Sequence, residues 1–447
     1  MPAPARTVRR HVALWWPYLL VVAMALLVTG LHVARFTQLS PIDETRHLDY
    51  MSQLTEGHVV KLGDKLGQDA MRIEACRGIA IPGFRLPPCN SPVFHPRAFR
   101  DRGYNNVTAH PPVYYAVTGF PARLISDAGL SGSIVDPARL LGGVWLAAGL
   151  VLALRAGELL GVRRLPLVAA AIAILAAPGF LTSFATVNPD AASVFAGGFV
   201  LFTAVAWEQH RVRIYWLAVA GGVAAALKMT NFIAVAIVAL WFLARALEPW
   251  WERRQGRKSE VDGRRYLKGA AILLASCLAV TIIWIVIASA RATIDPLMIP
   301  SNRAVYFSSF GWGVALDSLN LFALFPPIGG FTYAGLAKRG PLDLQTVTEW
   351  LAIAGLVAGF LRVSVRERLS LIATGSVAVL LSGGLGFMFL TWIANSVIFR
   401  PVSRYGLSAI PIVIVLIASL VKTRPARVFI SMFAALAISV TIFTLVV

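Results

Sequence analysis

The sequence predicts an all-α, polytopic membrane protein that crosses the bilayer as about 11 helices. Of its 447 residues, 57% are hydrophobic and only 14% are charged, whereas a soluble domain carries about 25% charged residues. The apolar residues also occur in runs of about 18 or more, the length of helix that crosses about 30 Å of hydrocarbon. These observations exclude a soluble globular protein.

The formal net charge of +19 at pH 7 would indicate nucleic-acid binding in a soluble chain. Here the Lys and Arg residues cluster in short loops between the apolar runs, which is the signal that keeps such loops in the cytoplasm during membrane insertion. We therefore predict that membrane lipids surround this chain and that it does not bind nucleic acid.

The first apolar run, 13–33, follows a basic start, and no small-residue cleavage site is evident. We predict a retained helix that leaves the cytoplasm. The polar segment 34–137 that follows is too long for a connector, and we predict an external loop with interfacial helices there. The next predicted spans are 138–160, 166–186, 191–208, 214–227, 230–247 and 269–290. The basic loop between the last two of these spans must be cytoplasmic.

A second external region is predicted over 291–345. Its middle, Leu316–Ile328, is apolar, but Pro326-Pro327 and Gly329-Gly330 interrupt it, which favours a re-entrant or interfacial segment over a spanning one. The remaining predicted spans, ending with the C-terminus outside, are 346–361, 369–392, 405–421 and 428–447. We expect the whole chain, 1–447, to form a single integral-membrane domain.

The three cysteines are too few for a disulfide framework or a zinc site. Cys76 and Cys89 flank one polar loop and could pair if that loop faces an oxidising compartment. Cys277 lies in an apolar run without a partner. The sequence leaves open whether the first two form a disulfide.

Asp43 and Glu44 lie immediately beyond the first span, with His47 one helical turn later. Two adjacent carboxylates at a helix start, next to a histidine, can supply a general base and a group that orients it. The same pattern fits an N-cap at Asp43 followed by a solvated face with Arg46 and Asp49. The two carboxylates are also hard ligands for a divalent metal, but a pair does not define a site. No metal site is predicted, and a divalent cofactor is left open.

His110 begins the segment His110-Pro111-Pro112-Val113-Tyr114-Tyr115 at the far end of the same loop. Paired prolines followed by tyrosines are typical of a helix that starts at the membrane interface.

Three cations lie outside the membrane in this topology. Arg400 and Arg404 precede the span 405–421, against the usual orientation of basic residues, and they fit either a clamp for an anionic lipid phosphate or ordinary contacts with head groups. Lys228 lies in a tight external turn between apolar helices, where an isolated charge is costly. A phosphate partner would offset that cost.

The order of these segments resembles the GT-C superfamily of integral-membrane glycosyltransferases. The resemblance is carried by Asp43-Glu44 with His47 and Tyr50, the His110 to Tyr115 segment, Lys228, and Arg404-Tyr405. Within the superfamily, the chain is most similar to a bacterial multi-pass family of unknown function with DE…H, HPPLYY and GRY segments. The resemblance implies transfer of a sugar from a polyprenyl phosphate to a glycan or lipid acceptor.

The resemblance also implies roles for individual residues. Asp43 matches the base or acceptor-orienting carboxylate, with Glu44 as its neighbour or substitute. Lys228, Arg404 and Arg400 match the cations that hold the donor lipid phosphate. The implied location is the bacterial inner (plasma) membrane, with the N-terminus in the cytoplasm and the active site on the other face, where cell-envelope glycans are assembled. Residues expected in the substrate cavity are His47, His110, Tyr114, Asn188, Asp190 and Tyr405.

The chemistry of such a transfer suits these residue types. Displacing a lipid phosphate from a sugar builds negative charge on the leaving oxygen, which fixed cations stabilise. The sequence contains neither a Gly-rich phosphate loop nor an acidic DxD-like pair of the kind used with nucleotide sugars. Two alternatives are a flippase for a lipid-linked glycan and a non-catalytic envelope assembly protein. A flippase would place polar groups near the bilayer midplane, where these spans carry almost none.

Overall fold

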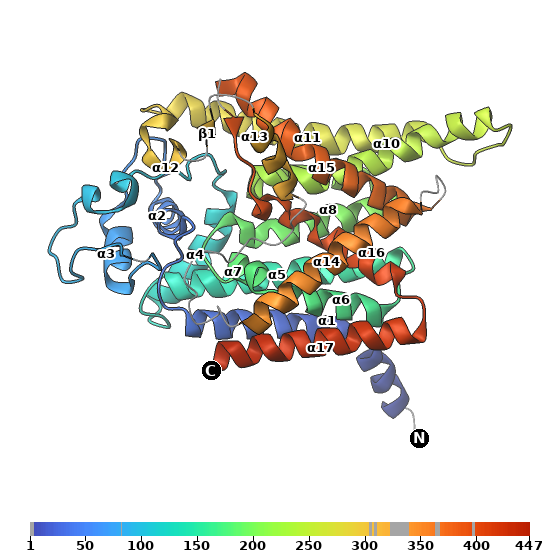
Figure 1. The fold of residues 1–447 in the computed structure, drawn as a ribbon, viewed down its shortest axis with the longest axis horizontal. Helices are drawn as coiled ribbons and strands as arrows, with labels where there is room; N and C mark the ends of the chain where they lie inside the picture. The colour runs from blue at the N-terminus through green and yellow to red at the C-terminus, as the bar shows by residue number, and fades with distance from the viewer. Residues whose placement is uncertain are drawn as a thin grey trace.

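The computed structural model describes residues 4–81, 83–303, 306–307, 311–321, 339–362, 367–395 and 398–447. Long helices run side by side through most of the molecule, and shorter helices gather at one end (Figure 1). The predicted all-α polytopic fold is confirmed, with one addition. Two short strands, β1 (Tyr306–Phe307) and β2 (Ile398–Phe399), pair antiparallel.

Within the described residues, nine helical segments are long and apolar enough to cross a membrane. Each overlaps one of the runs predicted from the sequence. They are α1 (Pro4–Arg35), α5 (Val135–Leu159), η3 (Pro189–Ala192) with α8 (Ser193–Glu208), η4 (Met229–Asn231) with α10 (Phe232–Arg254), α11 (Gly263–Arg291), α14 (Arg339–Leu361), α15 (Arg368–Asn395), η7 (Ser403–Ala409) with α16 (Ile410–Leu420), and α17 (Arg424–Val446).

The two remaining predicted spans differ from simple crossings. The run 166–186 is divided into α6 (Arg164–Leu175) and α7 (Pro178–Phe184), which meet at a bend of 82°. Pro178 causes the break, because a proline disfavours helical backbone in the residue before it, and Ala177 is extended with ψ 120. The run 214–227 forms α9 (Tyr215–Leu227), whose 13 residues are too short to cross alone.

Small residues bring the central helices together. α5 packs against α1 and α8, and α11 packs against α9 and α10. At the crossing of α5 and α8, a Cβ atom on Gly149 would lie 2.5 Å from the carbonyl carbon of Val194. Gly149 therefore permits the close backbone approach that is typical of helix packing in membranes.

The segment after α1 folds into a polar cap, which we define as residues 36–134. It contains α2 (Glu44–Thr55), α3 (Gln68–Arg77), η1 (Pro96–Ala98), η2 (Arg100–Gly103) and α4 (Val113–Asp127). A disulfide joins Cys76 to Cys89, which answers the question that the sequence left open. α4 buries Tyr114 and Tyr115 on one face and exposes Val117, Phe120 and Leu124 on the other, as an interfacial helix does.

The described part of the predicted second loop region contains short helices and the strand β1. η5 (Pro296–Met298), α12 (Pro300–Arg303), α13 (Trp312–Asp317) and η6 (Ser318–Leu321) succeed one another. Most of the expected re-entrant segment, Leu316–Ile328, with both Pro326-Pro327 and Gly329-Gly330, lies outside the described residues.

The ends of the chain lie on opposite sides of the bundle. In Figure 1 the N-terminus and the connection between α10 and α11 are at one end, and the C-terminus is toward the other end, where α2 and α3 also lie. The polar cap is therefore separated from the most basic loop by the length of the bundle.

Candidate active site

Asp43 occupies the turn before α2 in a left-handed backbone conformation, with φ 59 and ψ 9. Non-glycine residues rarely adopt this conformation. The side chain makes no capping hydrogen bond to α2. It accepts a hydrogen bond from Arg46 Nη1 at 2.7 Å, and its other oxygen lies 3.6 Å from Arg404 Nη2. The Asp43 side chain is 26% exposed, so it is accessible as well as paired.

Opposite charges alternate from Asp43 into the bundle. Arg404, in η7, lies 3.8 Å from Asp190 Oδ2, and Asp190, in η3, forms an ion pair with Lys228. The side chains of Lys228 and Asp190 are 2% and 4% exposed, and buried charges require such pairing. Three predicted site residues far apart in the sequence thus meet Asp43 at one place.

Asn188 positions Asp190. Its side-chain oxygen accepts from the backbone N–H of Asp190 at 2.8 Å, and its Nδ2 donates to Thr186 Oγ1 at 2.8 Å. This is an N-cap, with Pro189 at the first position of η3. Asn188 therefore shapes the turn and presents Asp190 to the two cations.

Two histidines and Tyr115 border the charged groups. His47 Nδ1 and Tyr115 Oη form a hydrogen bond of 2.7 Å, and the His47 and His110 rings are 5.6 Å apart. Burial, followed by Lys228, lowers the pKa of His110 to about 3. Burial is also the main cause that holds the pKa of His47 well below its usual value, and the neighbouring His110 is the second cause. Both imidazoles are therefore neutral near pH 7.

The aromatic ring of Tyr405 lies against Lys228. The Nζ atom is 4.9 Å from the centre of that ring, a cation–π arrangement. Tyr114 differs, because its side chain is fully buried in α4, with its ring 5.4 Å from Tyr115. Tyr114 therefore packs against Tyr115.

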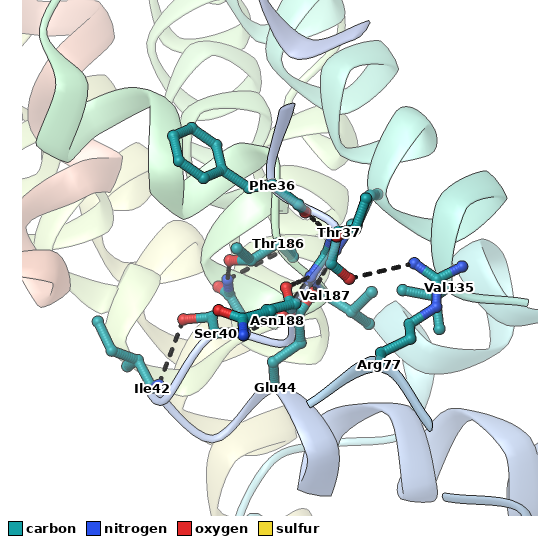
Figure 2. Close-up of polar contacts among 12 residues, drawn as sticks. Phe36, Thr37, Ser40, Ile42, Glu44, Arg77, Val135, Thr186, Val187 and Asn188 are labelled. Carbon is teal, nitrogen blue, oxygen red and sulfur yellow. Dashed lines mark hydrogen bonds and ion pairs between the residues drawn. The ribbon is translucent and has the colours of Figure 1, made fainter. Parts of the chain in front are cut away.

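Glu44 holds the turn together. It is fully buried, and Arg139 of α5 binds both of its oxygens at 2.8 Å. The backbone N–H groups of Ser40 and Val187 donate to the same carboxylate at 2.6 and 2.8 Å. Figure 2 shows Glu44 between these two backbone segments, beside Asn188. Protein donors thus occupy both oxygens of Glu44, whereas Asp43 is partly open.

Arg400 lies apart from the charges around Asp43. It is half-exposed and donates to Asp317 Oδ1 at 2.8 Å. Of the three cations proposed for a lipid phosphate, the structure brings Lys228 and Arg404 together and leaves Arg400 in a separate ion pair.

The structure excludes the solvated face of α2 that the sequence allowed as an alternative. Arg46 and Asp49 are buried, at 4% and 1% exposure. Arg46 bridges Asp43 and Asp101, and Asp49 accepts from Gln53, Gly67 and Asn105. The i,i+3 spacing of Asp43 and Arg46 is the signal that could have revealed their pairing. Arg139 carries no comparable signal, because 95 positions separate it from Glu44.

Within the ranges that the structure describes, no three His, Cys, Asp or Glu side chains are grouped so that they could hold a metal ion. Asp43 and Glu44, the carboxylates considered for a divalent metal, are instead directed to arginines.

Comparison with known proteins extends the description of the fold. No family model and no curated protein matches the sequence. Among solved structures, the chain is similar to the crystal structure of ArnT from Cupriavidus metallidurans bound to undecaprenyl phosphate, with a TM-score of 0.50 and 17% sequence identity. The match covers 91% of this chain and 60% of ArnT, so this chain spans less than two thirds of that protein's length. The chain therefore has an ArnT-like polytopic membrane fold.

Proposed function

We propose that this protein is a glycosyltransferase that uses a polyprenyl-phosphate-linked sugar on the extracytoplasmic face of the membrane, in cell-envelope glycan assembly. The observation that carries the proposal is the meeting of one accessible carboxylate, Asp43, with the cations Arg404 and Lys228. The similarity in fold to ArnT, whose structure contains undecaprenyl phosphate, agrees with it.

Arg404 and Lys228 would bind the lipid phosphate. Arg404 contacts its two carboxylates at 3.6 and 3.8 Å, longer than the roughly 2.7–2.9 Å of a charge-assisted hydrogen bond. Its guanidinium can therefore rearrange toward a phosphate, whose oxygens suit its planar set of donors. Lys228 adds a compact positive charge beside it.

The transfer step follows from this placement. As the bond between the sugar and the phosphate breaks, negative charge grows on the departing phosphate, and the two cations stabilise it. Asp43 would accept the hydrogen of the acceptor hydroxyl while that oxygen attacks the sugar. We assign this role to Asp43 and not to Glu44, because protein donors already occupy both oxygens of Glu44.

Two features support an extracytoplasmic site. Cys76 and Cys89 form a disulfide in the polar cap, and disulfides persist in oxidising compartments. The basic loop between α10 and α11 lies at the opposite end of the bundle (Figure 1), as expected of a cytoplasmic loop.

Binding of undecaprenyl phosphate to the purified protein in nanodiscs tests the phosphate site. We expect Arg404→Ala to weaken binding by about tenfold or more, since hydrogen bonds to charged groups contribute about 1.5–3 kcal/mol. Arg123→Ala is the matched control, because Arg123 belongs to the polar cap but pairs with Glu56 and Asp127 at the surface. Unchanged affinity in Arg404→Ala, or an equal loss in Arg123→Ala, would contradict this assignment.

A further inference from the structure

A small polar pocket connects Asp43 with a second carboxylate, Glu74 of α3. Asp43, Thr45, Arg46, Glu74 and Arg100 are among the residues that line it. The pocket has room for a water molecule and is partly open to solvent. Asp43, Arg46 and Glu74 on its wall are polar partners that can hold an ordered water there.

Glu74 is buried without a full set of partners. Its side chain is 2% exposed, and its Oε1 atom has no hydrogen-bond partner within the described part of the chain. The neighbouring arginines have other partners, although the buried Nε atom of Arg46 has none within the described residues. Arg46 pairs with Asp43 and Asp101, and Arg100 donates to the carbonyl oxygen of Pro41 at 2.7 Å. Burial makes a carboxylate in this position bind a proton more readily than an exposed carboxylate does.

The groups around Glu74 oppose this effect of burial without cancelling it. Burial raises the pKa of Glu74, and the smaller effects of Thr45, Arg46 and Arg100 lower it. The other acids that line the pocket are Asp43 and Glu44. Glu44 is occupied by Arg139 and two backbone N–H groups. Among the acids that line the pocket beside Asp43, Glu74 is therefore the one that is free to accept a proton.

We propose that Glu74 receives, through a water in this pocket, the proton that Asp43 takes from the acceptor hydroxyl. The inference rests on the proposed function. The acceptor oxygen bonds to the sugar as its O–H bond breaks, and the electron pair of the sugar–phosphate bond leaves with the polyprenyl phosphate. The proton moves to Asp43. The pocket water then takes that proton and gives one of its own to Glu74, which releases it to solvent.

This route restores Asp43 for the next turnover. While a lipid donor and an acceptor cover the exposed side of Asp43, the pocket side offers a path for the proton that does not cross the substrates. Glu74 is thus a proton-relay residue that acts through Asp43 and does not touch the sugar.

The test is the release of polyprenyl phosphate from a polyprenyl-phosphate sugar by Glu74→Gln, which keeps the size of the side chain. We expect kcat to fall by about tenfold to a hundredfold with unchanged KM, because a positioned proton-transfer group contributes 10²-fold or more. Added formate or imidazole, as small proton carriers, should restore part of the rate. Glu56→Gln is the control, since Glu56 is an exposed carboxylate at the end of α2.

Two results would overturn the relay. One is an unchanged kcat in Glu74→Gln, and the other is a loss of rate in a folded variant that added proton carriers do not relieve. Failure of the wild-type protein to turn over any sugar donor would instead count against the proposed function.

A measurement without substrate distinguishes failure of the relay from failure of the proposed function. The infrared band of a protonated carboxyl that disappears in Glu74→Gln belongs to Glu74, and its titration should shift in Asp43→Asn because the two groups share the pocket. An unshifted titration would rule out the proton connection whatever the activity of the protein.

Discussion

At the scale of single residues, the candidate site depends on how Asp43 is held. A non-glycine residue in the left-handed region costs about 1–3 kcal/mol, and it persists only where its surroundings fix it. Arg46 binds the Asp43 side chain, and Glu44 fixes the backbone on either side through Ser40 and Arg139. The strain and the accessible carboxylate therefore occur at the same position.

The Glu44–Arg139 pair is predicted to be a determinant of stability. Glu44→Gln leaves a buried guanidinium without its charge partner, which costs about 3–5 kcal/mol when one member of a buried pair is removed. Thermal unfolding in detergent should show a markedly lower midpoint. Replacing both residues with Met should cost less than the sum of the two single changes; additive losses would show that the pair is not coupled.

The neutral histidines predict a loss of stability in acid. The pKa of His110 is about 3 in the folded protein and about 6.5 in an unfolded chain. As the pH falls below 6.5, the unfolded state gains a proton that the folded state does not, so this contribution to stability is complete above pH 6.5 and declines toward pH 3. Melting midpoints measured across this interval should decline less in His110→Gln. Equal slopes would assign the acid sensitivity to other groups.

At the scale of elements, periodicity and proline placement explain what the sequence could predict. All the long apolar runs are helical, because burial in lipid leaves no other partner for the backbone. The sequence did not reveal the bend between α6 and α7, since 166–186 is apolar on both sides of Pro178. Nor did it reveal Glu44 as a structural clamp. Its partners Arg139 and Val187 come from distant segments, which only the packed bundle brings to α2.

The loop between Cys76 and Cys89 is hydrogen-bonded to the segment that precedes the Asp43 turn. Leu39 donates its N–H to Gly78 and accepts from the N–H of Ala80, both at 3.0 Å, directly after Cys76. Arg77 binds Asp136 at the start of α5 through two hydrogen bonds of 2.7 Å. The loop thus joins the segment before Asp43 to the transmembrane bundle.

Removing the disulfide should loosen this attachment. Closing a loop of this size contributes about 3 kcal/mol in the chain-entropy account. We expect Cys76→Ser with Cys89→Ser to increase proteolysis of the polar cap and to reduce polyprenyl-phosphate release, with the helix content unchanged. Wild-type resistance to protease and full activity in the double variant would show that the hydrogen bonds suffice without the disulfide.

At the scale of the whole molecule, the proposed function requires a fixed orientation in the membrane. The polar cap and the C-terminus share one end of the bundle, and the basic loop before α11 lies at the other (Figure 1). The charge pattern predicted this arrangement from the sequence alone. It could not predict that Asp43, Asp190, Lys228 and Arg404 meet, because convergence of four segments depends on how the helices pack.

Labelling of introduced cysteines tests the orientation. Cys76 and Cys89 are bonded and Cys277 is buried, so the wild-type background should react little. Leu130→Cys, at a side chain that is 79% exposed in the polar cap, should react with a membrane-impermeant maleimide in intact cells. Lys258→Cys should react only after permeabilisation. The reverse pattern would place the candidate site in the cytoplasm.

Turnover of a panel of polyprenyl-phosphate sugars by the purified protein in nanodiscs tests the proposed reaction and the role of Asp43 together. We predict that the wild-type protein releases free polyprenyl phosphate from one of them. Asp43→Asn should lose at least about a hundredfold in rate while keeping its melting midpoint. Asp127→Asn, at a surface ion pair of the same cap, should match the wild type. Full activity in Asp43→Asn would contradict the role of Asp43, and lipid binding without release by the wild type would contradict the glycosyltransferase itself.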